Sequence, residues 1–137
     1  MTNVHGHCVC GAVHITLKEY GSFVYTCHCD TCRRMNSGPV LSVDPGPKEN
    51  VVFEEGEDKI TIYHDEEVER GFCSVCGTTL FWHNPEQNHY CMNAEMFDDI
   101  IPSASFELEL FYDMKPAYYS FAGNRKKLDR NFSEIKE

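Results

Sequence analysis

Residues 26–40 read "TCHCDTCRRMNSGPV", which places three cysteines close together: Cys27, Cys29 and Cys32. On an extended strand, the side chains of Cys27 and Cys29 share a face because the residues are two positions apart. Cys32 follows where we expect the strand to give way to a short helix over residues 31–37, closed by Gly38. The three sulfurs can therefore converge on one metal ion. Tetrahedral zinc takes four ligands, so one position remains to be filled.

Two other side chains are candidates for that fourth position. His28 lies between Cys27 and Cys29, and we expect it to point to the opposite face of the strand, which makes it a poor ligand. Cys91 is a further thiol, but it sits in "HYCMNAEM", where a small half-buried apolar residue is ordinary. We expect three protein thiolates and an open position, the arrangement of a catalytic zinc site. Closure of the site by Cys91 or a histidine is the alternative.

Four more cysteines form two pairs that lie far apart in the sequence: Cys8 and Cys10 in "CVCG", and Cys73 and Cys76 in "CSVCG". We expect the first pair on one face of a strand and the second in a tight turn, where Gly77 supplies a positive φ. Zn–S bonds of about 2.3 Å place two ligand sulfurs about 3.8 Å apart. Both pairs can meet this spacing and complete a structural zinc site. The sequence thus predicts two zinc ions per chain.

The residues after Cys32 are basic. Zinc with three thiolates carries a net negative charge, is a weak Lewis acid, and is suited to holding a fourth sulfur as a thiolate. Arg33 and Arg34 can offset this charge and receive a carboxylate of an anionic thiol. Solvated helix arginines are the alternative interpretation. The spacing of Cys29 and Cys32 also matches a thioredoxin motif, but the βαβ context of that motif is missing.

Short segments of alternating apolar and polar residues dominate the chain, which is the signature of strands. They are residues 12–19, 22–29, 59–64, 78–83, 89–96 and 106–112. Turn signals such as "DPGPKEN" and "HNPEQN" separate them. No helices of 10–15 residues alternate with these segments, so we predict a mainly β, antiparallel fold. We expect one domain over residues 1–123 and a charged C-terminal tail over 124–137.

The 137 residues carry a net charge of −10 and eight cysteines. Nucleic acids and anionic membranes are recognised by clustered basic surfaces, so this charge argues against both as partners. No apolar run approaches the length of a membrane-spanning helix, and the first twenty residues do not resemble a secretory signal. We therefore expect a soluble cytoplasmic protein. In that reducing compartment, thiolates are favoured over disulfides.

Three blocks, "GHCVCGAVHITL", "CHCDTCRRMNSG" and "FCSVCGTTLF", resemble the glutathione-dependent formaldehyde-activating enzyme (Gfa) family. This family includes domains like that of centromere protein V. The resemblance covers residues 6–82, and "ELFYDMKPAYYSFAG" is similar to the family's ending. It implies an Mss4-like fold, a β-tent of short antiparallel strands with zinc-binding cysteine knuckles. It assigns Cys8, Cys10, Cys73 and Cys76 to a structural zinc, and Cys27, Cys29 and Cys32 to a catalytic zinc.

The resemblance also implies a reaction. The family's named activity joins glutathione to formaldehyde, giving S-(hydroxymethyl)glutathione, and is classed with carbon–sulfur lyases. We expect a zinc enzyme whose partners are a small thiol such as glutathione and a small aldehyde. A non-catalytic two-zinc module that binds a partner, and a zinc-linked redox sensor, are the alternatives. No motif marks residues that contact glutathione, and nothing indicates an oligomeric state.

Overall fold

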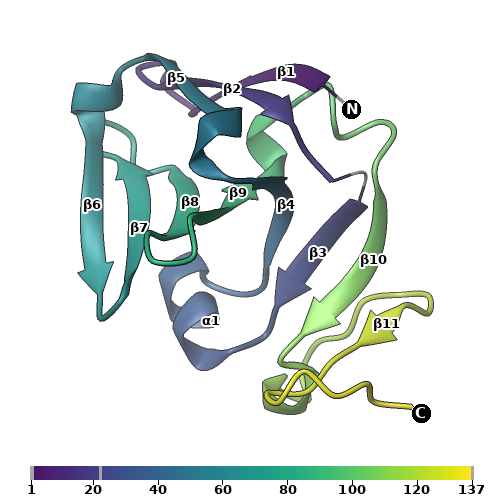
Figure 1. Cartoon of the computed structure of the whole chain (residues 1–137). Helices are drawn as coiled ribbons and strands as arrows, with labels where there is room; N and C mark the ends of the chain where they lie inside the picture. Colours follow the sequence, from purple (N-terminus) through teal and green to yellow (C-terminus); the bar gives the residue numbers. More distant parts are fainter. Residues whose placement is uncertain (1, 22, 137) are drawn as a thin grey trace. The chain divides into compact units, whose positions relative to one another are not determined.

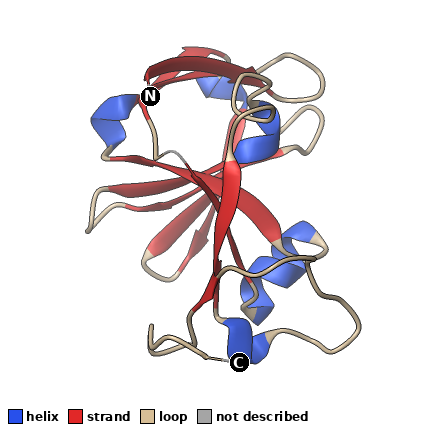
Figure 2. Ribbon diagram, turned by 90° about the vertical axis from the view of Figure 1, so that its right-hand side faces the viewer, coloured by secondary structure: helices blue, strands red, loops and turns tan. Residues whose placement is uncertain are grey.

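A computed structural model describes residues 2–21 and 23–136. Figure 2 shows strands as the main regular structure, accompanied by short helical segments. The chain divides into two compact units. Unit 1 comprises Met1–Ser22 and Ser42–Ala104, and unit 2 comprises Phe23–Leu41 and Ser105–Glu137. The predominance of strands confirms the mainly β fold. Each unit contains its own group of cysteines.

Unit 1 holds a three-stranded antiparallel sheet in the order β1 (Thr2–His7), β2 (His14–Glu19), β5 (Val51–Glu55). Its other strands pair antiparallel in the order β4, β9, β8, β7, β6. Their bounds are β4 Val40–Gly46, β6 Ile60–Asp65, β7 Val68–Cys73, β8 Thr79–Asn84 and β9 His89–Asn93. The chain passes from unit 2 into unit 1 within β4.

The interior of unit 1 is apolar. Alternation along β2 buries Ile15 and Leu17, as the sequence predicts for a half-buried strand. Fully buried side chains from β4, β8, β9 and the following segment join them: Val43, Leu80, Met92, Phe97 and Ile100. Burial of such side chains stabilises a fold by about 1.5–3 kcal/mol each, so unit 1 has an ordinary hydrophobic core.

Unit 2 is built differently. It contains β3 (Phe23–Cys27), α1 (Asp30–Asn36), β10 (Ser105–Leu110) and the two-residue β11 (Lys126–Lys127). Among its described residues, those exposed by no more than 1%, backbone included, are Thr26, His28 and Glu109, and none of them is apolar. The centre of unit 2 is therefore polar.

One feature of the sheet differs from the antiparallel arrangement that the sequence predicts. Strand β10 runs side by side with β3 in the same direction, and it also pairs in parallel with β11 (Figure 1). Parallel strands need a long connection, which is usually a helix. Here the chain between β3 and β10 includes the whole 42–104 part of unit 1, so no crossover helix is required.

Short 3₁₀ helices occupy Lys48–Asn50, Glu57–Lys59, Ala94–Met96 and Tyr112–Met114. The third of these interrupts the strand predicted over residues 89–96, because Asn93 Oδ1 accepts a hydrogen bond from the Glu95 amide at 3.0 Å and caps the turn. In the part of the chain that the structure describes, no helix has the length and apolar character to span a membrane. The proposed boundary between a domain over 1–123 and a tail over 124–137 stays a prediction.

Candidate metal centres

The first group of thiols lies in unit 1 and unites Cys8, Cys10, Cys73 and Cys76. All four sulfurs lie within 4.8 Å of one another. The sulfur of Cys10 is 3.6 Å from that of Cys8 and 3.8 Å from that of Cys73. These distances match the edge of about 3.8 Å expected for a ZnS₄ tetrahedron. The donor set therefore fits a zinc ion without rearrangement of the chain.

Two similar turns present these sulfurs. Strand β1 ends at His7, so Cys8 and Cys10 lie in a turn and not on one strand face as the sequence predicts. The amide of Gly11 donates to the Cys8 carbonyl at 3.1 Å, and the amide of Gly77 donates to the Cys73 carbonyl at 2.8 Å. Both glycines have a φ near +80° (79° and 80°), which a residue with a Cβ rarely adopts. The positive φ expected of Gly77 is confirmed.

Hydrogen bonds to sulfur favour ionised thiols in this group. The amides of Val13 and Ala12 donate to Cys8 Sγ and Cys10 Sγ, each at 3.4 Å. The hydroxyl and amide of Thr78 donate to Cys76 Sγ and lower the pKa of Cys76 to about 5. The Ala12 amide also lowers the pKa of Cys10, but burial and the neighbouring thiols outweigh it and raise this pKa to about 12. Adjacent thiolates repel one another unless a cation lies between them, so this group of thiols is suited to a metal ion.

The second group lies in unit 2 and consists of Cys27, Cys29 and Cys32, whose sulfurs also lie within 4.8 Å of one another. Cys27 is the last residue of β3. Cys29 is the N-cap of α1, with extended backbone angles of −63° and 155°, and its sulfur accepts a hydrogen bond from the Cys32 amide at 3.4 Å. The predicted strand-to-helix transition is confirmed, although α1 begins and ends one residue earlier than expected.

This second group has three donors. In the ranges that the structure describes, no fourth Cys, His, Asp or Glu belongs to it. His28 is fully buried and its ring nitrogens face Glu109 and Tyr119, which agrees with the expectation that it points away from the sulfurs. Cys91 lies on β9 in unit 1 and is in neither group.

The electrostatics of the second group also fit a cation. Hydrogen bonds with Cys29 and Cys32, together with burial, raise the pKa of Cys27 well above its ordinary value. A divalent cation would favour ionisation of these thiols, because it stabilises adjacent thiolates that otherwise repel one another. The chain contributes eight cysteines, all within the described residues, and none of them forms a disulfide.

The two arginines predicted near this group lie in the last turn of α1. The Nε–H of Arg33 donates to the carbonyl oxygen of His28 at 3.0 Å. This bond uses one of the five N–H donors of the guanidinium. Arg34 is exposed. A role of either residue in holding a carboxylate stays a prediction.

The hydrogen bonds around His28 involve three residues that were not identified from the sequence: Glu109, Tyr119 and Arg125. Glu109 accepts hydrogen bonds from His28 Nε2 and from Arg125 Nη1, each at 2.7 Å. Burial lowers the pKa of His28, which favours the neutral ring. Because Nε2–H donates to Glu109, Nδ1 is the acceptor, and it receives the Tyr119 hydroxyl at 2.7 Å. Tyr119 thus donates to His28, and both His28 and Arg125 donate to the carboxylate of Glu109.

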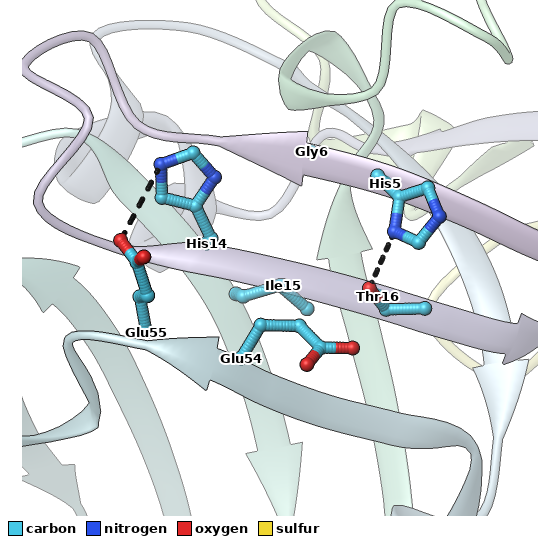
Figure 3. A pocket seen from close by; sticks show the side chains of 7 residues that line it. All are labelled: His5, Gly6, His14, Ile15, Thr16, Glu54 and Glu55. Atoms are coloured by element: carbon cyan, nitrogen blue, oxygen red, sulfur yellow. Dashed lines mark hydrogen bonds and ion pairs between the residues drawn. The ribbon is translucent and has the colours of Figure 1, made fainter.

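A separate hollow of about 250 Å³ lies on the sheet of β1, β2 and β5, shown in Figure 3. Its lining consists of His5, Gly6, His14, Ile15, Thr16, Glu54 and Glu55. His5 Nδ1 lies 2.6 Å from the Thr16 hydroxyl, and His14 Nε2 lies 3.9 Å from a Glu55 carboxylate oxygen. The hollow contains no cysteine, so it belongs to neither group of thiols.

A mainly β fold with a four-thiol and a three-thiol group defines the class of protein, a small cysteine-rich domain equipped to bind metal. The chain belongs to the glutathione-dependent formaldehyde-activating enzyme family, whose model matches residues 3–114. It is 32% identical over 123 residues to an uncharacterized lyase of Schizosaccharomyces pombe, covering 89% of this chain and 88% of the relative. The crystal structure of a Rhodobacter sphaeroides protein has a similar fold, with a TM-score of 0.61 at 20% identity, covering 74% of this chain and 98% of that one.

Proposed function

We propose that the chain is a zinc-dependent enzyme of the carbon–sulfur lyase type that joins a small thiol to a reactive aldehyde. Glutathione and formaldehyde, which give S-(hydroxymethyl)glutathione, are the proposed pair. The observation that carries the proposal is the donor count of the second group. Three thiols, with no fourth donor among the residues that the structure describes, occur in a member of a family described by this activity. The lyase name of the yeast relative supports the same class of reaction.

The proposal gives the two groups of thiols different roles. Cys8, Cys10, Cys73 and Cys76 hold a structural zinc, because four donors close a tetrahedral site. Cys27, Cys29 and Cys32 hold the catalytic zinc. Zinc at this second position supplies one property when bound: it lowers the pKa of a thiol that completes its coordination.

The reaction forms a C–S bond and an O–H bond, and it breaks the S–H bond of the thiol and the π bond of the carbonyl group. The sulfur of the ionised thiol adds to the carbonyl carbon of formaldehyde, and the carbonyl oxygen takes up the proton that the thiol released. The reverse reaction breaks the C–S bond and returns the thiol and the aldehyde. We assign Arg33 and Arg34 to a carboxylate of glutathione, because both follow Cys32 directly on α1. We expect this chemistry in a reducing compartment such as the cytoplasm, where thiols persist.

Exchange spectroscopy tests the proposal. Formaldehyde and glutathione form the adduct without a catalyst, so the measured quantity is the rate of exchange between ¹³C-formaldehyde and the adduct at equilibrium. Zinc-loaded protein should increase this rate, and Cys29→Ser should remove the increase. Cys91→Ser serves as the matched control and should exchange like the unsubstituted protein. An exchange rate equal to the spontaneous rate would overturn the proposed function.

A further inference from the structure

The polar centre of unit 2 is an unusual way to build an interior. A buried carboxylate paired with a buried guanidinium contributes little net stability, because removing both charges from water offsets their attraction. Glu109 and Arg125 are nonetheless buried together, and their side chains are 2% and 8% exposed. The Arg125 guanidinium also packs on the Phe106 ring, 4.1 Å from its centroid. Such an arrangement fixes geometry more effectively than it adds stability.

These contacts hold the side chain and the backbone of His28 in one orientation. Its amide donates to the Leu110 carbonyl at 2.9 Å, and its own carbonyl accepts from Arg33. Its two ring nitrogens are bonded to Glu109 and Tyr119. Every hydrogen-bonding atom of His28 thus has a partner within unit 2. Aromatic rings enclose the imidazole as well, with Tyr119 stacked at 5.5 Å and Tyr112 edge-on at 5.8 Å.

His28 is the residue between two thiols of the second group. The sulfurs of Cys27 and Cys29 lie within 4.8 Å of each other, whereas the imidazole between them is directed to Glu109 and Tyr119, so the backbone of residues 27–29 links the direction of the imidazole to that of the two sulfurs. A rigidly held His28 therefore prevents rotation of the two peptide units that carry these sulfurs. Groups that support ligands in this way affect metal affinity although they never touch the metal.

We propose that Tyr119, Glu109 and Arg125 are positioning residues for the Cys27–Cys29–Cys32 centre, acting through the side chain of His28. The inference deepens the proposed function, since it requires that the three thiols hold a metal, but it does not depend on which reaction follows. It assigns a role to residues 119 and 125, which lie beyond the part of the chain that the family model matches.

The test measures how fast each metal leaves the full-length, cobalt-loaded protein when a chelator is added. We expect the metal to be released in two kinetic phases, one for each group of thiols. The phase that is missing in Cys29→Ser is assigned to the second group. Tyr119→Phe keeps the ring and removes only the hydroxyl that holds His28. It should accelerate the second-group phase about tenfold and leave the first-group phase unchanged. Glu109→Gln should accelerate the same phase.

Two matched controls make the same chemical changes elsewhere in unit 2. Tyr118→Phe alters an exposed tyrosine next in sequence, and Asp113→Asn breaks the carboxylate–arginine pair with Arg130. Both should release metal like the unsubstituted protein. If Glu109→Gln does not fold, Tyr119→Phe decides the question alone.

Unchanged release in Tyr119→Phe would overturn the inference, and so would equal acceleration of both phases, which indicates general destabilisation. Either result would leave the proposed reaction standing. Conversely, absence of catalysed exchange would overturn the reaction and leave the positioning role intact, because metal release is measured without any substrate.

Discussion

Glu109 and His28 are 81 positions apart, yet the carboxylate of Glu109 accepts a 2.7 Å hydrogen bond from His28 Nε2. This bond ties the residue between two thiols to a strand near the C-terminal end of the chain. It joins β10 to the β3–α1 connection, so the second group of thiols depends on both segments of unit 2. The first group depends in the same way on two distant turns of unit 1.

Metal content is the first prediction. The full chain, prepared under reducing conditions without chelators, should contain two zinc ions, because two separate groups of thiols exist. The second group should lose its zinc first, since it has one fewer protein ligand. Elemental analysis during a chelator titration measures both quantities. A single zinc per chain would contradict the two-site account.

The two groups should also differ in their contribution to stability. Cys73→Ser should lower the free energy of unfolding more than Cys32→Ser. The sulfur of Cys73 lies beside that of Cys10, which is 63 positions away, so a metal held by both connects two distant turns of the chain. Binding of a structural zinc contributes about 10 kcal/mol or more to folding of small zinc domains. Denaturant titrations compare the variants, with Cys91→Ser as a control of small effect. Equal losses would mean that both groups are structural.

Gly56 packs closely against the backbone of Ala12, two residues after Cys10. Its φ is +77°, and a Cβ at this position would overlap the Ala12 carbonyl oxygen, in the turn that follows Cys10. Gly56→Ala should therefore lower the free energy of unfolding by about 3 kcal/mol, from strain and overpacking combined. Gly46→Ala is the control, because Gly46 has a φ of +80° but only an ordinary contact. Similar losses in both variants would show that the contact with Ala12 is unimportant.

Much of this architecture could be predicted from the sequence, because its signals are local. Alternation predicts strands such as β2 and β8, and the spacing of the cysteines separates them into groups of four and three. The short helix expected over residues 31–37 and its closure by Gly38 likewise depend on residues within a single turn, and α1 spans Asp30–Asn36. Short-range patterns of this kind can be recognised without knowledge of the tertiary fold.

The parts that could not be predicted depend on distant segments. Parallel pairing of β3 with β10 has no local signal, because no helix connects the strands. The strand that contains Glu109 alternates apolar and charged residues, which gives no reason to expect a buried carboxylate. Only tertiary structure shows that Arg125 and His28 satisfy it. The positions of Cys8 and Cys10 in a turn also required the structure, since spacing alone suits a strand as well.

Substrate charge provides a further prediction. If Arg33 and Arg34 receive a carboxylate of glutathione, replacing both with alanine should weaken glutathione binding about tenfold or more, corresponding to roughly 1.5–3 kcal/mol for a bond to a charged group. Binding of uncharged 2-mercaptoethanol should change little. Titration of each thiol against the metal-loaded protein supplies both constants. Parallel weakening for the two thiols would contradict a role in carboxylate recognition.

The central claim is that the second group leaves a metal position for an incoming thiol, and cobalt absorption tests it most directly. Addition of glutathione to cobalt-substituted protein should change the thiolate-to-metal absorption. The change should vanish in Cys29→Ser and persist in Cys91→Ser, because only the first variant removes a proposed ligand. No spectral change at millimolar thiol, together with loss of second-group metal in Cys91→Ser, would contradict the account and identify a closed, structural site.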